Sequence, residues 1–175
     1  DVCSSDLDAV NVYYHVESFR ERLAGYFTTL GANVTFPADP LAVLVSAQSV
    51  DTNGDGLTYN DTNNAAYLNV PCHSTDASTS RCLVILPPAV ASSTTCGDNV
   101  TFYPLGREAL IPVHEYQHYI TDTLTQMPMG ENAYNVGDAL HEGFSDYMAA
   151  SHVSQDAGVD VTLVGAYAFQ NCTSI

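Results

Sequence analysis

The sequence HEYQH at residues 114–118, followed by EGFSD at residues 142–146, is the stretch that decides the fold. Residues four apart lie on one face of a helix, so His114 and His118 can direct two imidazole rings at one ion. Glu115 then lies beside that ion, where a carboxylate can act as a base. This spacing predicts a metal centre on a helix.

The second motif supplies the acidic side chains of the same centre. Glu142 is the natural third ligand, because two histidines and one glutamate form a known catalytic zinc set. Asp146 lies one turn further on and can accept the free ring N–H of a ligating histidine. A solvated acidic helix face is the alternative. We expect Phe144, Tyr147 and Met148 to bury the segment, where two carboxylates without a cation would be costly.

The two motifs together resemble the gluzincin metallopeptidases, in their thermolysin-like and fungalysin-like branches. Other matching stretches occur in the same order between about residues 8 and 150, namely Tyr13-Tyr14, 41–47, 63–67 and 101–105. The resemblance implies a zinc-dependent endopeptidase in which Glu115 takes a proton from water and later passes it to the leaving amine. Leu110 stands where the thermolysin-like branch has an acidic calcium ligand, which favours the fungalysin-like branch.

The pattern along the chain predicts an α+β fold of the zincin-like type. Apolar residues at three- and four-residue spacing indicate an amphipathic helix over residues 8–28, closed by Gly31. Short apolar runs indicate buried strands over residues 41–45 and 83–86. Because proline is tolerated in the first turn of a helix, Pro112 indicates a metal-binding helix that begins near Arg107. A third helix is expected over residues 135–153, with the site where the sheet edge meets the helices.

By the same resemblance, Asn64 and Ala65 lie on an edge strand that holds the backbone of an extended peptide substrate. An ordinary polar turn that leads into a strand is an equally good interpretation of these two residues.

The segment DTNGDG at residues 51–56 resembles the start of a calcium loop. Its candidate ligands are Asp51, Asn53 and Asp55, with Asp61 or backbone carbonyls to complete the site. Thr62 stands where an EF-hand needs a bidentate glutamate, which excludes a complete EF-hand. The alternatives are a looser calcium site and a plain turn.

Composition fits a secreted or extracellular enzyme, which we expect to be a monomer, and the resemblance implies a peptide or protein substrate. The 175 residues carry a formal net charge of −16, which disfavours nucleic acid and anionic membranes as partners. Cys72 and Cys82 flank a polar stretch and are expected to form a disulfide in an oxidising compartment. Cys96 with Cys172 is the remaining pairing, which leaves Cys3 over. A non-catalytic extracellular module that binds calcium or zinc is the alternative function.

The chain is expected to be a partial catalytic domain that occupies residues 8–175. Residues 1–7 resemble the translation of a sequencing adapter, and we expect them to be foreign to the natural protein. In the family, a tyrosine and a histidine beyond the second motif stabilise the oxyanion. Tyr134 is a weak candidate for the tyrosine, and no histidine follows His152. The 175-residue chain is therefore expected to have weak activity or none.

Overall fold

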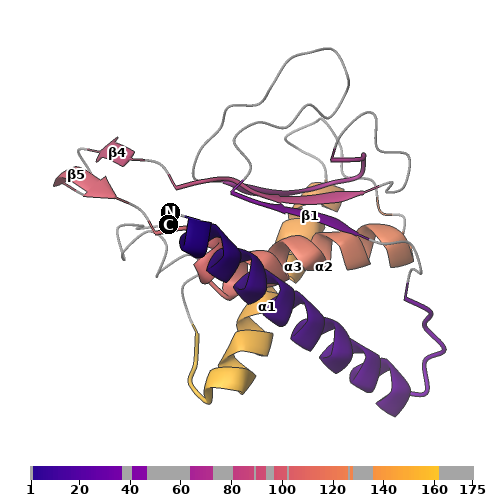
Figure 1. The fold of residues 1–175 in the computed structure, drawn as a ribbon. Coiled ribbons are helices and arrows are strands. Elements are labelled where there is room, and N and C mark those ends of the chain that lie inside the picture. Colours follow the sequence, from indigo (N-terminus) through magenta and orange to yellow (C-terminus); the bar gives the residue numbers. More distant parts are fainter. Residues whose placement is uncertain are drawn as a thin grey trace.

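The fold combines three long helices with a small mixed sheet, which confirms the predicted α+β class. The computed structural model describes residues 2–36, 41–46, 64–72, 81–88, 90–93, 97–101, 103–125, 127 and 136–161. The helices are α1 (Val2–Thr29), α2 (Leu110–Thr125) and α3 (Val136–Ala157), and a short 3-10 turn, η1 (Leu105–Arg107), precedes α2. Figure 1 shows the sheet lying over α2, with α1 crossing in front of α2 and α3.

The sheet has three described strands in the order β1 (Ala42–Val45), β3 (Cys82–Ile85), β2 (Ala65–Leu68). β3 pairs with β1 in parallel and with β2 in antiparallel orientation. β3 is fully buried, as predicted, whereas β1 is an edge strand that is only half-buried, so the expectation of a buried strand there was wrong. β2 forms the other edge and lies against α2. A separate hairpin joins β4 (Val90–Ser93) to β5 (Gly97–Thr101).

The two faces of the sheet pack into different apolar clusters, because successive side chains on a strand point to opposite sides. Leu83 and Ile85 join the main core, which is built from one face of each helix. Val84 lies on the other face with Cys72 and Cys82. These two cysteines form a disulfide with a Cα–Cα distance of 5.0 Å, which ties the end of β2 to the start of β3 as the sequence predicts.

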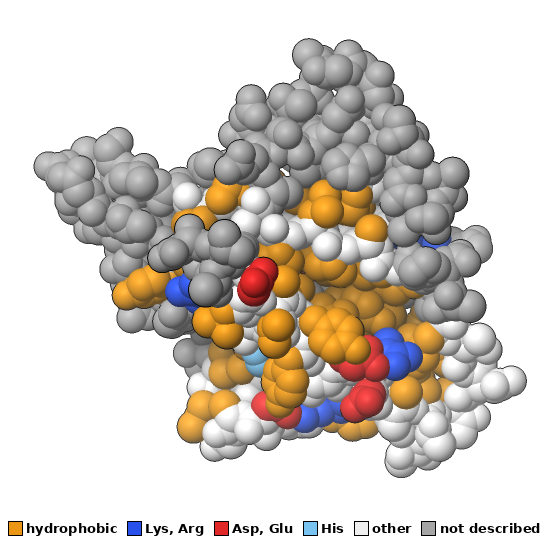
Figure 2. All heavy atoms as spheres, in the orientation of Figure 1, with side chains coloured by type: hydrophobic (Ala, Val, Ile, Leu, Met, Phe, Trp, Pro, Cys, Tyr) orange, Lys and Arg blue, Asp and Glu red, His pale blue; other side chains and the backbone are white. Residues whose placement is uncertain are grey.

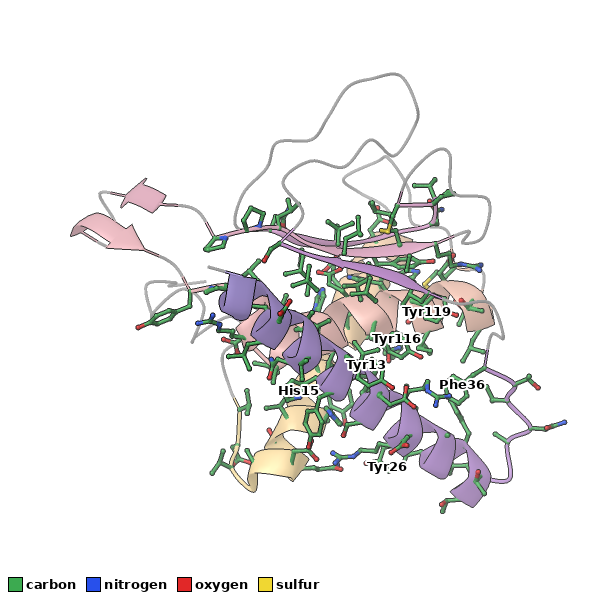
Figure 3. The ribbon with its side chains drawn as sticks, viewed as in Figure 1. Tyr13, His15, Tyr26, Phe36, Tyr116 and Tyr119 are labelled. Atoms are coloured by element: carbon green, nitrogen blue, oxygen red, sulfur yellow. A yellow bond between two sulfur atoms is a disulfide. The ribbon has the colours of Figure 1, made fainter. Side chains whose placement is uncertain are left out.

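Aromatic side chains of α2 fill the space between α1 and the sheet. The rings of Tyr116 and Tyr119 lie 5.4 Å apart, and Phe19 of α1 packs edge-on against Tyr116. The labels in Figure 3 place both tyrosines between α1 and the strands. This packing fixes the position of α2 beneath β2, and therefore the position of the histidines that α2 carries.

Helix α1 begins six residues before the predicted start. Its first turns expose Leu7 and Val10 to solvent, so they carry no apolar period from which the sequence could predict a helix. The predicted end at Gly31 is confirmed. Gly31 has φ of 65°, the N–H of Ala32 donates to the carbonyl of Phe27, and the N–H of Gly31 donates to Thr28. This is a Schellman motif, which favours glycine at the left-handed position.

The other two helices also differ slightly from the predicted ranges. Residues 105–107 form the tighter turn η1, so α2 begins at Leu110 and Pro112 lies in its first turn. The third helix continues to Ala157. Among the described residues, no helix has both the length and the apolar character needed to cross a lipid bilayer.

Each of the four arginines lies in an ion pair with an acidic side chain. The pairs are Arg20 with Glu17, Arg22 with Asp156, Arg81 with Asp122, and Arg107 with Asp8. In the face shown in Figure 2, blue side chains lie beside red ones, and apolar side chains gather in the middle. Since the chain has 20 acidic residues and 4 basic ones, most of its negative charge has no arginine partner.

Candidate metal centre

Three side chains from α2 and α3 converge on one point. His114 Nε2 lies 3.0 Å from His118 Nε2 and 3.2 Å from Glu142 Oε2, and His118 Nε2 lies 3.6 Å from Glu142 Oε1. The three residues form a group that could hold a metal ion. The predicted ligand set is therefore brought together by the packing of α2 against α3.

The spacing of these atoms fits a small tetrahedral ion. Bonds of about 2.0–2.2 Å to zinc at tetrahedral angles place neighbouring ligand atoms about 3.3 Å apart. The two Nε2 atoms lie 3.0 Å apart, and each lies within 3.6 Å of one of the two carboxylate oxygens of Glu142, close to that value. Two imidazole nitrogens and one carboxylate oxygen are also donors that zinc accepts.

Asp146 lies where the sequence predicts it, on the far nitrogen of His114. The Nδ1 of His114 is 2.9 Å from Asp146 Oδ1. An ionised carboxylate only accepts hydrogen bonds, so Nδ1 carries the proton and Nε2 keeps its lone pair. That lone pair belongs to the atom that faces His118 and Glu142. Asp146 thus orients His114 and selects the tautomer that can bind a metal.

The carboxylates of this centre are not buried, contrary to the expectation from the sequence. The side chains of Glu142 and Asp146 are 60% and 57% exposed. Phe144 and Tyr147 are also largely exposed. The desolvation argument for a bound cation therefore fails, and the case for a metal rests on the convergence of the donors.

The histidine on the inner side of the centre is held neutral. Burial, followed by the neighbouring His114 and His141, lowers the pKa of His118 to about 3. A neutral imidazole is the form that binds metals. His118 is therefore in its ligand form at neutral pH.

Glu115 lies beside the centre in a buried position. Its Oε2 accepts a hydrogen bond of 2.8 Å from the backbone N–H of Tyr67 in β2. Burial raises the pKa of Glu115 to about 7, although His114 and the Tyr67 N–H partly oppose the rise. This carboxyl group can therefore take up or release a proton near neutral pH. The contact with Tyr67 was not predicted, because backbone pairing between distant segments leaves no trace in the sequence.

Tyr67, whose backbone N–H makes this contact, is also held by its side chain. Its hydroxyl donates to Asp122 Oδ2 over 2.7 Å, and Arg81 Nε also donates to that oxygen. Asp122 lies on α2 and Arg81 precedes β3, so the group ties β2, β3 and α2 together. These hydrogen bonds fix the position of β2 relative to Glu115.

A cavity of about 310 Å³ joins the metal-binding group to the edge of β2. It is lined by Glu115, by the three candidate ligands and by residues 64–67. The Asn64 carbonyl accepts from Leu86, so alternation along the strand turns the backbone groups of Ala65 and Tyr67 away from β3. The structure thus places the predicted substrate residues, Asn64 and Ala65, at the mouth of the centre. Asn64 directly precedes β2, and Ala65 is its first residue.

The other predicted sites lie outside the described residues. These are the calcium candidates Asp51, Asn53, Asp55 and Asp61, and the oxyanion candidate Tyr134. Cys96 and Cys172 also fall outside, and the side chain of Cys3 is not described. His141 and His152 are buried and are not members of the metal-binding group.

No protein-family model, curated protein or solved structure matches this chain. The functional argument therefore depends on the chemistry of the site.

Proposed function

We propose that this chain is a catalytic domain of a zinc-dependent endopeptidase with a zincin-like fold, similar to the gluzincins and closer to their fungalysin-like branch. One observation carries the proposal. A two-histidine, one-glutamate group, a buried carboxyl with a pKa near 7 and an edge of β2 that no described strand covers line the same cavity. A structural metal site needs neither the carboxyl nor the strand.

The ion in this proposal is zinc, held by His114, His118 and Glu142. When bound, zinc supplies Lewis-acid activation of water and of a carbonyl group. Three protein ligands leave one position open, as in other catalytic zinc sites, whereas structural sites use four. The described residues offer only three donors within reach of one another, which supports the catalytic interpretation.

Glu115 is the proton carrier in this mechanism. Its Oε2 is held by the Tyr67 N–H, and no other described residue donates to its carboxylate. Oε1 can therefore accept a proton from water in the cavity and later donate it to the leaving amine nitrogen. A pKa of about 7 suits both halves of this transfer, because neither protonation state is strongly favoured.

The substrate is an extended peptide that adds to the edge of β2 that no described strand covers. The outward carbonyl of Ala65 can accept a hydrogen bond from the peptide backbone, and the Asn64 side chain lies beside it. Main-chain pairing of this kind holds a peptide without regard to most of its side chains. It also places a backbone carbonyl of the peptide near Glu115 and the metal-binding group, since all of them line one cavity.

The disulfide supports a location outside the reducing cytosol. Cys72 and Cys82 are bonded in the structure, and such bonds persist mainly in oxidising compartments. The disulfide therefore supports the proposal that the enzyme is secreted.

The experiment compares three forms of the chain in long incubations with a mixture of unstructured peptides, followed by mass spectrometry. The zinc-loaded wild-type chain should cleave internal peptide bonds slowly. Glu115→Gln should retain zinc and cleave at least about 100-fold more slowly, because general acid–base catalysis supplies about that factor. Glu21→Gln, which removes the same charge from an exposed position on α1, is the matched control and should cleave as the wild type does.

Two results would overturn the proposal. One is retention of about one tightly bound zinc per chain by a His118→Ala variant, measured by metal analysis. The other is cleavage by Glu115→Gln at the rate of the Glu21→Gln control.

A further inference from the structure

A tripeptide just beyond α1 belongs neither to the metal centre nor to a helix or strand. Asn33-Val34-Thr35 has the Asn-X-Thr pattern, with X other than proline, that N-glycosylation requires. Three further copies of this pattern begin at Asn60, Asn99 and Asn171, but their side chains lie outside the described residues. Since a pattern this short also arises by chance, its meaning depends on where the structure places it.

The tripeptide lies on a surface loop that is fixed at both ends. Before it, Gly31 closes α1, and the N–H of Ala32 donates to the carbonyl of Phe27. After it, the ring of Phe36 lies 5.9 Å from the ring of Phe27, so the chain turns back towards the helix. Figure 3 shows Phe36 beside the C-terminal half of α1. Residues 32–36 between these contacts have no regular secondary structure.

Both side chains that a glycosyltransferase must reach are open to solvent. Asn33 and Thr35 are exposed, and only Val34 between them is half-buried. The neighbouring threonines, Thr28 and Thr29, donate their hydroxyl groups to carbonyls one turn back in α1. Thr35 lies beyond the helix, and no described residue hydrogen-bonds to its hydroxyl. The asparagine amide and the threonine hydroxyl are therefore both accessible.

The disulfide indicates a compartment in which this modification takes place. Cys72 and Cys82 are bonded, as expected for a chain that passes through an oxidising secretory compartment. In eukaryotes the lumen of the endoplasmic reticulum is such a compartment, and N-linked oligosaccharides are added to surface loops of proteins there. Pattern, exposure and compartment are three separate observations that agree at Asn33.

We propose that Asn33 is an acceptor site for an N-linked oligosaccharide, supplied by a polyprenyl diphosphate donor in a eukaryotic secretory pathway. In this transfer the side-chain amide nitrogen of Asn33 forms a bond to the anomeric carbon of the first sugar. The bond between that carbon and the diphosphate oxygen breaks, the lipid diphosphate leaves, and the amide nitrogen loses one proton to a base. No oxidant or reductant takes part. The site does not depend on the metal centre.

The direct test locates carbohydrate on the secreted chain. The full chain is produced behind a cleavable signal peptide in eukaryotic cells, and its N-glycans are released enzymatically in heavy-oxygen water. This release converts a glycosylated asparagine to an aspartate that carries the label, which mass spectrometry of peptides then locates. We expect the label at Asn33. An unlabelled Asn33 would overturn the proposal, whether or not other asparagines are labelled.

Three substitutions test whether the pattern directs the modification. Thr35→Ala keeps Asn33 but destroys the pattern, so the secreted chain should lose the mass of one glycan and the label at Asn33. Thr35→Ser keeps the pattern and should keep the glycan. Thr29→Ala is the matched control, because it removes a nearby threonine that belongs to no such pattern, and it should also keep the glycan. Label that persists at Asn33 in Thr35→Ala, or disappears in Thr29→Ala, would contradict the assignment.

Urea unfolding of the same secreted proteins tests the exposed position. A bulky group on a surface loop leaves the packed core unchanged, so the wild type and Thr35→Ala should unfold at closely similar urea concentrations. A glycosylated wild type that is much less stable than Thr35→Ala would contradict the surface position of the site. None of these measurements uses zinc or peptide cleavage, so their outcome is independent of the proposed peptidase function.

Discussion

Replacing Glu115 by glutamine should make the metal-free chain more stable at alkaline pH. Burial raises the pKa of this carboxyl from 4.5 to about 7, so the folded chain holds its charged form at a cost. Glutamine has the same shape, stays neutral and keeps an oxygen that can accept from the Tyr67 N–H. The substitution therefore removes the charge without emptying the space.

The direction of the pH dependence follows from the two pKa values. Between about pH 4.5 and pH 7 the folded chain binds more protons at Glu115 than the unfolded chain does, so rising pH lowers its stability across this window. The difference between the two values corresponds to about 3 kcal/mol once the pH exceeds 7. Below pH 4.5 both states are protonated and the penalty disappears. Relative to the wild type, Glu115→Gln should gain about 3 kcal/mol at pH 8 and almost nothing at pH 4.

Urea unfolding of the chelator-treated proteins at pH 4, 6 and 8 measures this difference. Glu21→Gln is the control, since it removes one negative charge from an exposed position and corrects for the general repulsion of a chain with net charge −16. The reasoning is refuted if Glu115→Gln and Glu21→Gln show the same stability change at pH 8. A gain for Glu115→Gln that is as large at pH 4 as at pH 8 would also contradict it.

Three further substitutions test other parts of the structure. Asp146→Asn should weaken zinc binding by about 10- to 100-fold in chelator competition, because the charged acceptor on His114 is lost, and unchanged affinity would contradict that role. Asp8→Asn should lower the unfolding free energy by about 1–3 kcal/mol in urea, because it removes the charged acceptor from the 2.6 Å contact that Arg107 makes with this buried side chain. An equally stable variant would show the ion pair to be unimportant. Cys72→Ser should lower the unfolding free energy by about 2–3 kcal/mol in the absence of reductant, as expected for a disulfide that spans 10 residues. A difference in unfolding free energy from the wild type that persists in reductant would instead point to a loss of packing.

The helices and strands that bury a regular apolar face could be predicted from the sequence. The three- and four-residue spacing that begins at Val12 identified α1, and the apolar run at Leu83 identified the central strand β3. The start of α1 could not be predicted, because its first turns face solvent. Nor does a short apolar run distinguish a central strand from an edge strand such as β1, since that depends on which strands pair.

The candidate metal-binding residues could be predicted because their spacing is local. His114 and His118 share a helix face, and Glu142 and Asp146 share another, so two short patterns contain most of the site. The two sequence patterns do not predict how α2 and α3 pack against each other. That packing exposes Glu142, buries His141 against His118, and brings the backbone of β2 to Glu115.

Anomalous diffraction at the zinc edge, from crystals of the chain grown with zinc, tests the metal centre most directly. The account predicts one strong peak, about 2.0–2.2 Å from Nε2 of His114, from Nε2 of His118 and from a carboxylate oxygen of Glu142. Glu115 should lie beside the peak without binding it. Density for zinc only at other positions, or no zinc between α2 and α3, would contradict the account.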